Sequence, residues 1–188
     1  VIRMFEARAI SCVKGDRLLF EDLSLHVRPG QVCQIRGGNG TGKTTLLRIL
    51  CGRSLPDSGD VLWDGSLIGQ DPGRFQCDLA YIGHSNGIKM DLTARENLAF
   101  SLTMQSASAS TSIDDAIAKA GLSGSGNLLC RLLSAGQRRR VAIARLYLTS
   151  ASLWVLDEPL GAIDADGIQD IENALEEHLS RNGMVILT

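Results

Sequence analysis

Eight consecutive residues near position 40 have the spacing of a phosphate-binding loop. The pattern G-x-x-x-x-G-K-[ST] is matched by Gly37, Gly38, Asn39, Gly40, Thr41, Gly42, Lys43 and Thr44. Glycines let such a loop curl so that successive N–H groups point at one place, which favours a bound phosphate. Lys43 is suited to reach the β- and γ-phosphates, and the Thr44 hydroxyl is suited to coordinate Mg²⁺. We therefore predict a nucleoside triphosphate site formed by these residues and Thr45.

A second feature is an apolar stretch at residues 153–156 that is followed directly by Asp157 and Glu158. Carboxylates that follow a strand lie at the carboxyl edge of a parallel sheet, where α/β proteins bind ligands. Asp157 is suited to hold Mg²⁺, and Glu158 to polarise the water that attacks the γ-phosphate. A solvated acidic turn is the alternative, which the nearby phosphate loop disfavours. We predict Lys43 and Glu158 as catalytic residues.

The third feature is the segment 133–137, which reads Leu-Ser-Ala-Gly-Gln. Ser134 and Gln137 have the spacing of a capping box, which predicts that a helix begins there. Its N-terminus offers a hydroxyl and free N–H groups, and so a second anion site. Because one nucleotide needs only one such site, we infer that this segment meets a nucleotide bound to another copy. The arginine triplet 138–140 could indicate nucleic-acid binding, but such triplets are more often a solvated face.

The surrounding elements fit an α/β domain. The apolar run 32–35 predicts a strand entering the phosphate loop, and residues 45–50 predict the helix leaving it. We expect further strands over residues 4–11, 23–27, 61–63, 153–156 and 184–187. The pattern becomes helical after residue 83, where Thr93 and Glu96 form a candidate capping box. Apolar residues at helical spacing over 168–179 predict a helix that Gly183 would end. Strands alternating with helices indicate a parallel-sheet core.

Composition limits the remaining possibilities. The 188 residues are 44% hydrophobic, enough for one compact domain. With 19 Lys and Arg against 21 Asp and Glu, the chain carries no general electrostatic footprint for nucleic acid. No apolar run reaches the ~18 residues that cross a bilayer, so we predict no direct membrane span. Five scattered cysteines without a C-x-x-C pair predict reduced thiols and a cytoplasmic location.

The three features in this order resemble the ATP-binding-cassette (ABC) family of ATPases, over essentially the whole chain. The Leu-Ser-x-Gly-Gln signature distinguishes this family, and residues 160–164 resemble its D-loop. The resemblance implies one nucleotide-binding domain over 1–188, with a phosphate-loop (RecA-like) parallel-sheet core. It adds an N-terminal antiparallel β-subdomain and a helical signature subdomain at about residues 84–148.

The same resemblance implies a head-to-tail homodimer that holds two ATP molecules with Mg²⁺. Each ATP would lie between the phosphate loop of one subunit and the signature segment of the other. The residues that would contact the nucleotide of the partner copy are Ser134, Ala135, Gly136, Gln137 and Asp164. Closing and opening of the dimer would drive integral membrane subunits of a transporter.

A narrower resemblance is to the ATP-binding subunits of cytochrome c maturation haem exporters. It rests on residues 81–89, 92–98, 133–142 and 153–159. In that subgroup a histidine replaces the Q-loop glutamine and alanine is the third signature residue, as His84 and Ala135 are here. The resemblance implies a catalytic role for His84, a packed histidine being the alternative. It implies a peripheral ATPase on the cytoplasmic face of the inner membrane, whose activity supports haem export or release of a haem-loaded chaperone.

Other functions stay open at this point. The chain could serve a lipid, polysaccharide or drug exporter, or act as a soluble cassette ATPase on ribosomes or DNA. Val13 and Lys14 stand where many relatives stack an aromatic ring on adenine, so guanine stays possible. The histidines are His26, His84 and His178, and none has the place of the family's switch histidine after the last strand. We therefore expect the sequence to be trimmed at its C-terminal end, or else to hydrolyse nucleotide slowly.

Overall fold

The structure is a computed structural model, and it describes residues 3–103, 111–161 and 165–188. The chain divides into two compact units. The first contains the N-terminal residues to Tyr81, together with Ser152–Asp157 and His178–Thr188. The second contains Ile82–Ala151 and Glu158–Glu177.

The first unit contains an antiparallel sheet in the strand order β2-β1-β4-β5. Its strands are β1 (Phe5–Lys14), β2 (Arg17–Val27), β4 (Ser58–Trp63) and β5 (Ser66–Leu67). Alternation along β1 buries Phe5 and Ala7 while Glu6 stays partly exposed, as expected of a sheet with one covered face. The predicted N-terminal antiparallel sheet is confirmed.

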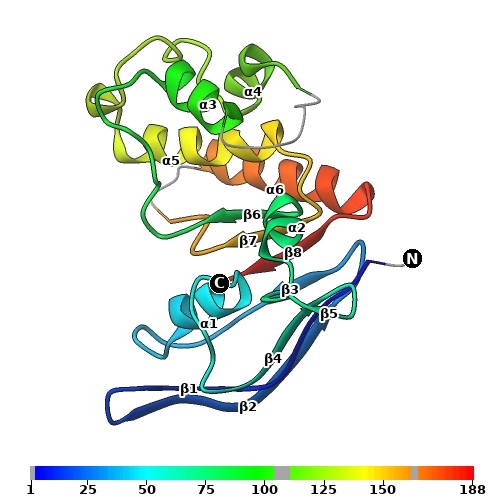
Figure 1. Ribbon diagram of the computed structural model, residues 1–188. Helices are drawn as coiled ribbons and strands as arrows, with labels where there is room; N and C mark the ends of the chain where they lie inside the picture. Colours follow the sequence, from blue (N-terminus) through cyan, green and yellow to red (C-terminus); the bar gives the residue numbers. More distant parts are fainter. Residues whose placement is uncertain (1–2, 104–110, 162–164) are drawn as a thin grey trace. The chain divides into compact units, whose positions relative to one another are not determined.

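A second sheet of the same unit has the order β3-β8-β7-β6 (Figure 1). Its strands are β3 (Val32–Gln34), β8 (Met184–Leu187), β7 (Leu153–Leu156) and β6 (Leu79–Ile82). Strand β8 pairs in parallel with both β3 and β7. All four residues of β7 are buried, which is typical of a central strand covered on both faces. The predicted parallel core is confirmed.

Two helices of this unit complete its core. Helix α1 (Lys43–Leu50) contributes Leu47 and Leu50, which are fully buried in one cluster with residues of both sheets. The short helix α2 (Pro72–Cys77) begins at Asp71, whose carboxylate accepts a hydrogen bond from the Arg74 N–H. The predicted helix after the phosphate loop is thus present, and it begins two residues earlier than expected.

The second unit is helical. It contains α3 (Ala94–Thr103), α4 (Ile113–Lys119), α5 (Ala135–Ala144) and most of α6 (Ala165–Ser180), with the short 3₁₀ helices η1 (Cys130–Leu132) and η2 (Arg145–Leu148). Leu98, Leu122 and Val141 lie in its buried core. The capping box before α3 is present, because the Glu96 N–H donates to Thr93 Oγ1 and the Thr93 N–H donates to the Glu96 carboxylate.

The C-terminal end of α6 differs from the prediction. The helix ends at Ser180, and the residue in the left-handed conformation is Asn182, with φ 63°. Gly183 is required for a different reason, since a Cβ there would lie 2.3 Å from the His178 ring. Among the described residues, no helix combines the length and the apolarity needed to cross a bilayer.

Candidate nucleotide-binding site

Three strands of the parallel sheet end at one edge. Since β3 and β7 both run parallel to β8, their carboxyl ends lie on the same side of the sheet (Figure 1). Strand β3 leads to the phosphate loop, β7 leads to Asp157, and β8 leads to Thr188. The first unit therefore gathers its candidate ligand-binding groups at the edge where open α/β sheets bind ligands.

The backbone of the phosphate loop requires glycine at two points. Gly40 and Gly42 have φ values of 75° and 99°, in the left-handed region. Gly42 is also the N-cap of α1, and a Cβ there would lie 3.1 Å from the Leu19 side chain. The loop thus delivers the chain to the N-terminus of α1, where the first N–H groups of a helix and its dipole favour an anion.

Two side chains of the loop donate hydrogen bonds to the loop's own backbone carbonyls. Lys43 Nζ donates to the carbonyl oxygens of Gly37 and Gly38, at 2.8 and 2.9 Å. The Thr41 hydroxyl also donates to the Gly38 carbonyl, at 2.9 Å. Thr44 and Thr45 follow in the first turn of α1, whereas Asn39 is exposed. The Lys43 ammonium group and a helix N-terminus form a donor set that fits a triphosphate.

Asp157 lies at the end of β7 with only 1% of its surface exposed. Its Oδ1 accepts a hydrogen bond from Thr188 Oγ1 at 3.1 Å. The phenol of Tyr81 has a raised pKa, first because of burial and then because of the negative charge of Asp157. The carboxylate and the Thr44 hydroxyl are both oxygen ligands of the kind Mg²⁺ prefers, so the residues present fit this ion.

The second unit brings His84 and Glu158 together. His84 Nδ1 lies 3.5 Å from Glu158 Oε2, and the two side chains are 78% and 48% exposed. Glu158 has a φ of 47°, an uncommon conformation for a residue other than glycine. The pair is therefore open to solvent, while the backbone of its carboxylate member is held in an unusual conformation.

The signature segment forms a complete capping box at the start of α5. Ser134 Oγ accepts the Gln137 N–H at 3.1 Å, and Gln137 Oε1 accepts the Ser134 N–H at 2.9 Å. Ala135 and Gly136 lie in the first turn. The predicted helix start is confirmed, and the contact with a second copy stays a prediction. Asp164, predicted for the same contact, lies outside the described residues.

The interpretation of the arginine triplet as a solvated face is wrong for Arg139, which is 4% exposed. Arg138 and Arg140 are partly buried, and Arg140 pairs with Asp170 at 3.3 Å. The reason lies in the helical period: Arg139 is one turn before Ala142 and Ile143, which are buried, and so shares their face of α5. That spacing is the sequence signal by which its burial could have been predicted.

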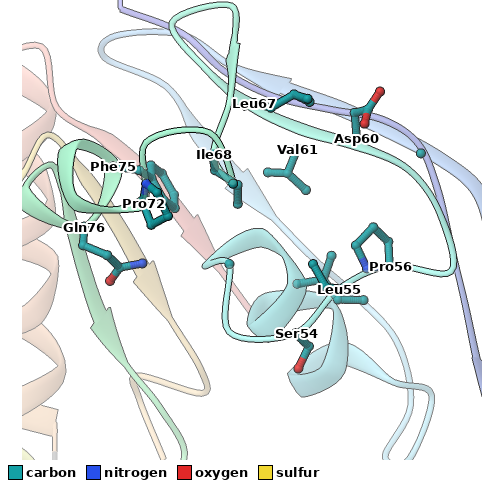
Figure 2. A pocket seen from close by; sticks show the side chains of 14 residues that line it. Ser54, Leu55, Pro56, Asp60, Val61, Leu67, Ile68, Pro72, Phe75 and Gln76 are labelled. Atoms are coloured by element: carbon teal, nitrogen blue, oxygen red, sulfur yellow. The ribbon is translucent and has the colours of Figure 1, made fainter.

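A separate hollow of about 240 Å³ lies in the first unit (Figure 2). Its lining is mostly apolar and includes Leu55, Ile68 and Phe75, with Gln76 among its few polar side chains. Ile49 and Gly52 also line it, which places it at the C-terminal end of α1. The phosphate loop lies at the opposite end of that helix, so the hollow is not part of the candidate nucleotide site.

Fold and loop together define the class as a phosphate-loop nucleotide-binding domain. Residues 20–161 match the protein family described as ABC transporter. The chain belongs to the ABC transporter family, as its ATP-binding subunit, and both the predicted family and the predicted fold class are confirmed.

Curated relatives agree with this assignment, and two solved structures share the fold. Two relatives are named cytochrome c biogenesis ATP-binding export protein CcmA. The one from Aliivibrio fischeri is 45% identical over 98% of this chain and 91% of its own length. The one from Nitrosomonas europaea is 46% identical over 100% of this chain and 88% of its own length.

An ABC transporter ATP-binding protein from Pyrococcus furiosus has a TM-score of 0.83 at 24% identity, covering 98% of this chain and 90% of its own. A structure titled ATP binding subunit of ABC transporter has a TM-score of 0.85 at 20% identity, covering 98% and 79%; both structures share the fold.

Proposed function

We propose that this chain hydrolyses ATP with Mg²⁺ to drive membrane subunits that handle haem during cytochrome c biogenesis. The carrying observation is the identity of 45–46% over nearly the whole chain to two proteins named for ATP-binding export in cytochrome c biogenesis. The replacement of the Q-loop glutamine by His84 and the alanine at position 135 favour the haem-exporter subgroup. The nearly balanced charge disfavours nucleic acid as a partner.

The phosphate loop supplies the binding energy in this proposal. Lys43 exchanges its two loop carbonyl acceptors for oxygens of the β- and γ-phosphates, and the N–H groups at the start of α1 hold the remaining charge. Thr44 and Asp157 would hold Mg²⁺, which would offset negative charge on the phosphates. Thr188, by donating to Asp157 Oδ1, keeps one carboxylate oxygen fixed in orientation.

Glu158 acts on the attacking water. Its carboxylate accepts a hydrogen bond from the water and orients it toward the γ-phosphate. His84 Nδ1, 3.5 Å from Glu158 Oε2, can donate to that carboxylate when this nitrogen carries the proton. A neutral imidazole can accept at one nitrogen and donate at the other, as the amide of a Q-loop glutamine can. His84 is therefore proposed to orient Glu158.

The signature segment completes the site of a second copy. In a head-to-tail homodimer, the Ser134 hydroxyl and the N–H groups of the first turn of α5 contact the nucleotide held by the partner, and Asp164 is proposed for the same contact. Two nucleotides are then enclosed, and hydrolysis reopens the dimer. We place the chain as a peripheral subunit at the cytoplasmic face of the inner membrane, bound to integral membrane subunits.

The test uses the natural protein carrying Glu158→Gln, which should bind MgATP and stall before hydrolysis. It is purified with ATP from detergent-solubilised native membranes, and the copurifying proteins are identified by mass spectrometry. The visible spectrum is recorded for a haem Soret band. Lys43→Met, which should not retain ATP, is the matched control for nucleotide-dependent partners.

Recovery of haem-handling membrane subunits with Glu158→Gln supports the proposal. Recovery of an unrelated permease contradicts the haem client and leaves the ATPase mechanism in place. Recovery of ribosomes or DNA in place of membrane proteins contradicts the transport role itself.

A further inference from the structure

One buried guanidinium connects three parts of the second unit. Arg139 of α5 donates through Nη2 to the Glu158 carbonyl at 2.8 Å and through Nη1 to the Gly83 carbonyl at 2.9 Å. Nη1 also donates to Asn86 Oδ1 at 3.2 Å, and Nε to the Pro159 carbonyl at 3.4 Å. The signature helix, the segment around His84 and the turn after Asp157 are therefore tied together by a single side chain.

Two of the acceptors belong to the backbone that carries the His84–Glu158 pair. Gly83 directly precedes His84, and the other carbonyl belongs to Glu158 itself. A guanidinium is planar and presents its N–H groups in a fixed fork, so it can hold two carbonyls at a set separation. Arg139 reaches the two carbonyls from two different nitrogens, whereas a lysine ammonium has all its N–H donors on one nitrogen and cannot reproduce this geometry. Arg139 therefore sets the spacing of the backbone that carries both side chains.

The conformation of Glu158 makes this contact consequential. With a φ of 47°, its backbone occupies a region that residues other than glycine rarely adopt, and such conformations persist only where the surroundings enforce them. The hydrogen bond from Arg139 to the Glu158 carbonyl is one such constraint. Without it, the peptide can rotate toward a common conformation, which would redirect the carboxylate.

A second arginine holds the far side of the His84 segment. Arg145, which follows α5 directly, donates through Nη2 to the Asn86 carbonyl at 2.6 Å and through Nη1 to the Gly87 carbonyl at 3.5 Å. Arg139 and Arg145 thus both donate hydrogen bonds to residues on the C-terminal side of His84, and Arg139 also donates to the glycine before it. The segment that carries His84 must follow the position of α5.

We propose that Arg139 is a positioning residue for ATP hydrolysis that links the N-terminus of α5 to the His84–Glu158 pair. The helix begins at the signature Ser134, five residues earlier, so a contact made there would be transmitted to Glu158 through one rigid turn and one guanidinium. This inference rests on the proposed ATPase function and on the proposed role of Glu158.

The experiment compares steady-state ATP hydrolysis of the natural protein with that of Arg139→Gln. Arg140→Gln is the matched control, since it removes the same charge one residue away, where the partner is Asp170. We expect Arg139→Gln to lower kcat by about 10- to 100-fold, the scale of a misplaced catalytic group. KM and the affinity for ATP should stay unchanged, and Arg140→Gln should retain full kcat. A kcat for Arg139→Gln equal to that of Arg140→Gln would overturn the proposal.

Two further variants separate positioning from general damage. Arg139→Lys keeps the charge without the bridge, so it should lose kcat in the same direction; if Arg139→Gln does not fold, this variant decides, and a normal kcat refutes the proposal. In single-turnover hydrolysis, the double variant Arg139→Gln/Glu158→Gln should be no slower than Glu158→Gln alone, because both substitutions impair the action of the same Glu158 carboxylate. Additive losses of rate would contradict the proposal. If the unmutated protein shows no turnover, the proposed ATPase function is contradicted and this inference with it. If the unmutated protein is active and Arg139→Gln has the same kcat as Arg140→Gln, only this inference is contradicted.

Discussion

The substitution Ser134→Ala distinguishes a purely structural role of the signature serine from a catalytic one. Ser134→Ala removes the hydroxyl that accepts the Gln137 N–H at 3.1 Å, which leaves half of the capping box. Loss of such a cap costs about 1 kcal/mol of stability. For a chain of this size, that corresponds to a fall in Tm of about 2–4 °C. A purely structural role for Ser134 predicts this change and little effect on turnover.

A contact with the partner's nucleotide predicts a larger loss. A hydrogen bond to a charged group contributes about 1.5–3 kcal/mol, which corresponds to about a 10- to 150-fold fall in kcat/KM. We therefore expect Ser134→Ala to fold, to bind ATP at its own phosphate loop, and to lose both turnover and ATP-dependent dimerisation. Thermal unfolding, phosphate release and light scattering on the same preparation measure the three quantities.

Two controls make the comparison quantitative. Ser112 caps α4 in the same way, accepting the Asp115 N–H at 3.1 Å, so Ser112→Ala should lower Tm similarly and leave kcat/KM unchanged. Ser134→Asp keeps a capping oxygen and should retain Tm, while its charge repels a triphosphate and abolishes turnover. The reasoning is refuted if Ser134→Ala loses no more activity than Ser112→Ala, or if Ser134→Asp remains active.

Two further substitutions each test the role of one side chain, Lys43 or His178. Lys43→Met should weaken ATP binding about 10- to 150-fold, the equivalent of one lost charge-assisted bond, and an unchanged affinity in a fluorescence titration would contradict its role. His178 stacks on Trp154 at 3.8 Å, and burial lowers its pKa, with hydrogen bonds to the Met184 and Ser152 backbone opposing the shift. As the pH falls, His178 therefore binds a proton in the unfolded chain before it does so in the folded chain. The stability that neutral His178 contributes is complete above pH ~6.5 and declines from there down to the lowered pKa. His178→Phe should flatten that part of a pH series of denaturant unfolding curves, and an unaltered slope would assign it to other groups.

Short apolar runs and local turn chemistry made much of the fold predictable. Strand β7 was predicted with its bounds because four buried residues end at a charged pair. Strands β1 and β2 extend further than their predicted ranges, since their exposed faces carry polar residues that weaken an apolar pattern. The end of α6 was misassigned to Gly183 because the adjacent Asn182 also tolerates a left-handed backbone.

The contacts that tune the site were less predictable. The phosphate loop and the capping box of α5 depend on residues a few positions apart, so sequence spacing reveals them. Arg139 meets Gly83 and Glu158 across 56 and 19 positions, and Thr188 meets Asp157 across 31. No local pattern encodes such pairs, because they arise only once the elements have packed. The juxtaposition of His84 and Glu158 is of the same kind.

The most direct test of the central claim measures bound ATP and released phosphate in one sample of the natural protein and of Glu158→Gln. If the chain is an ATP-hydrolysing subunit with Glu158 at its catalytic centre, the natural protein releases phosphate, while Glu158→Gln retains MgATP and releases almost none. Equal phosphate release by the two proteins, or no ATP retained by either, would contradict the account.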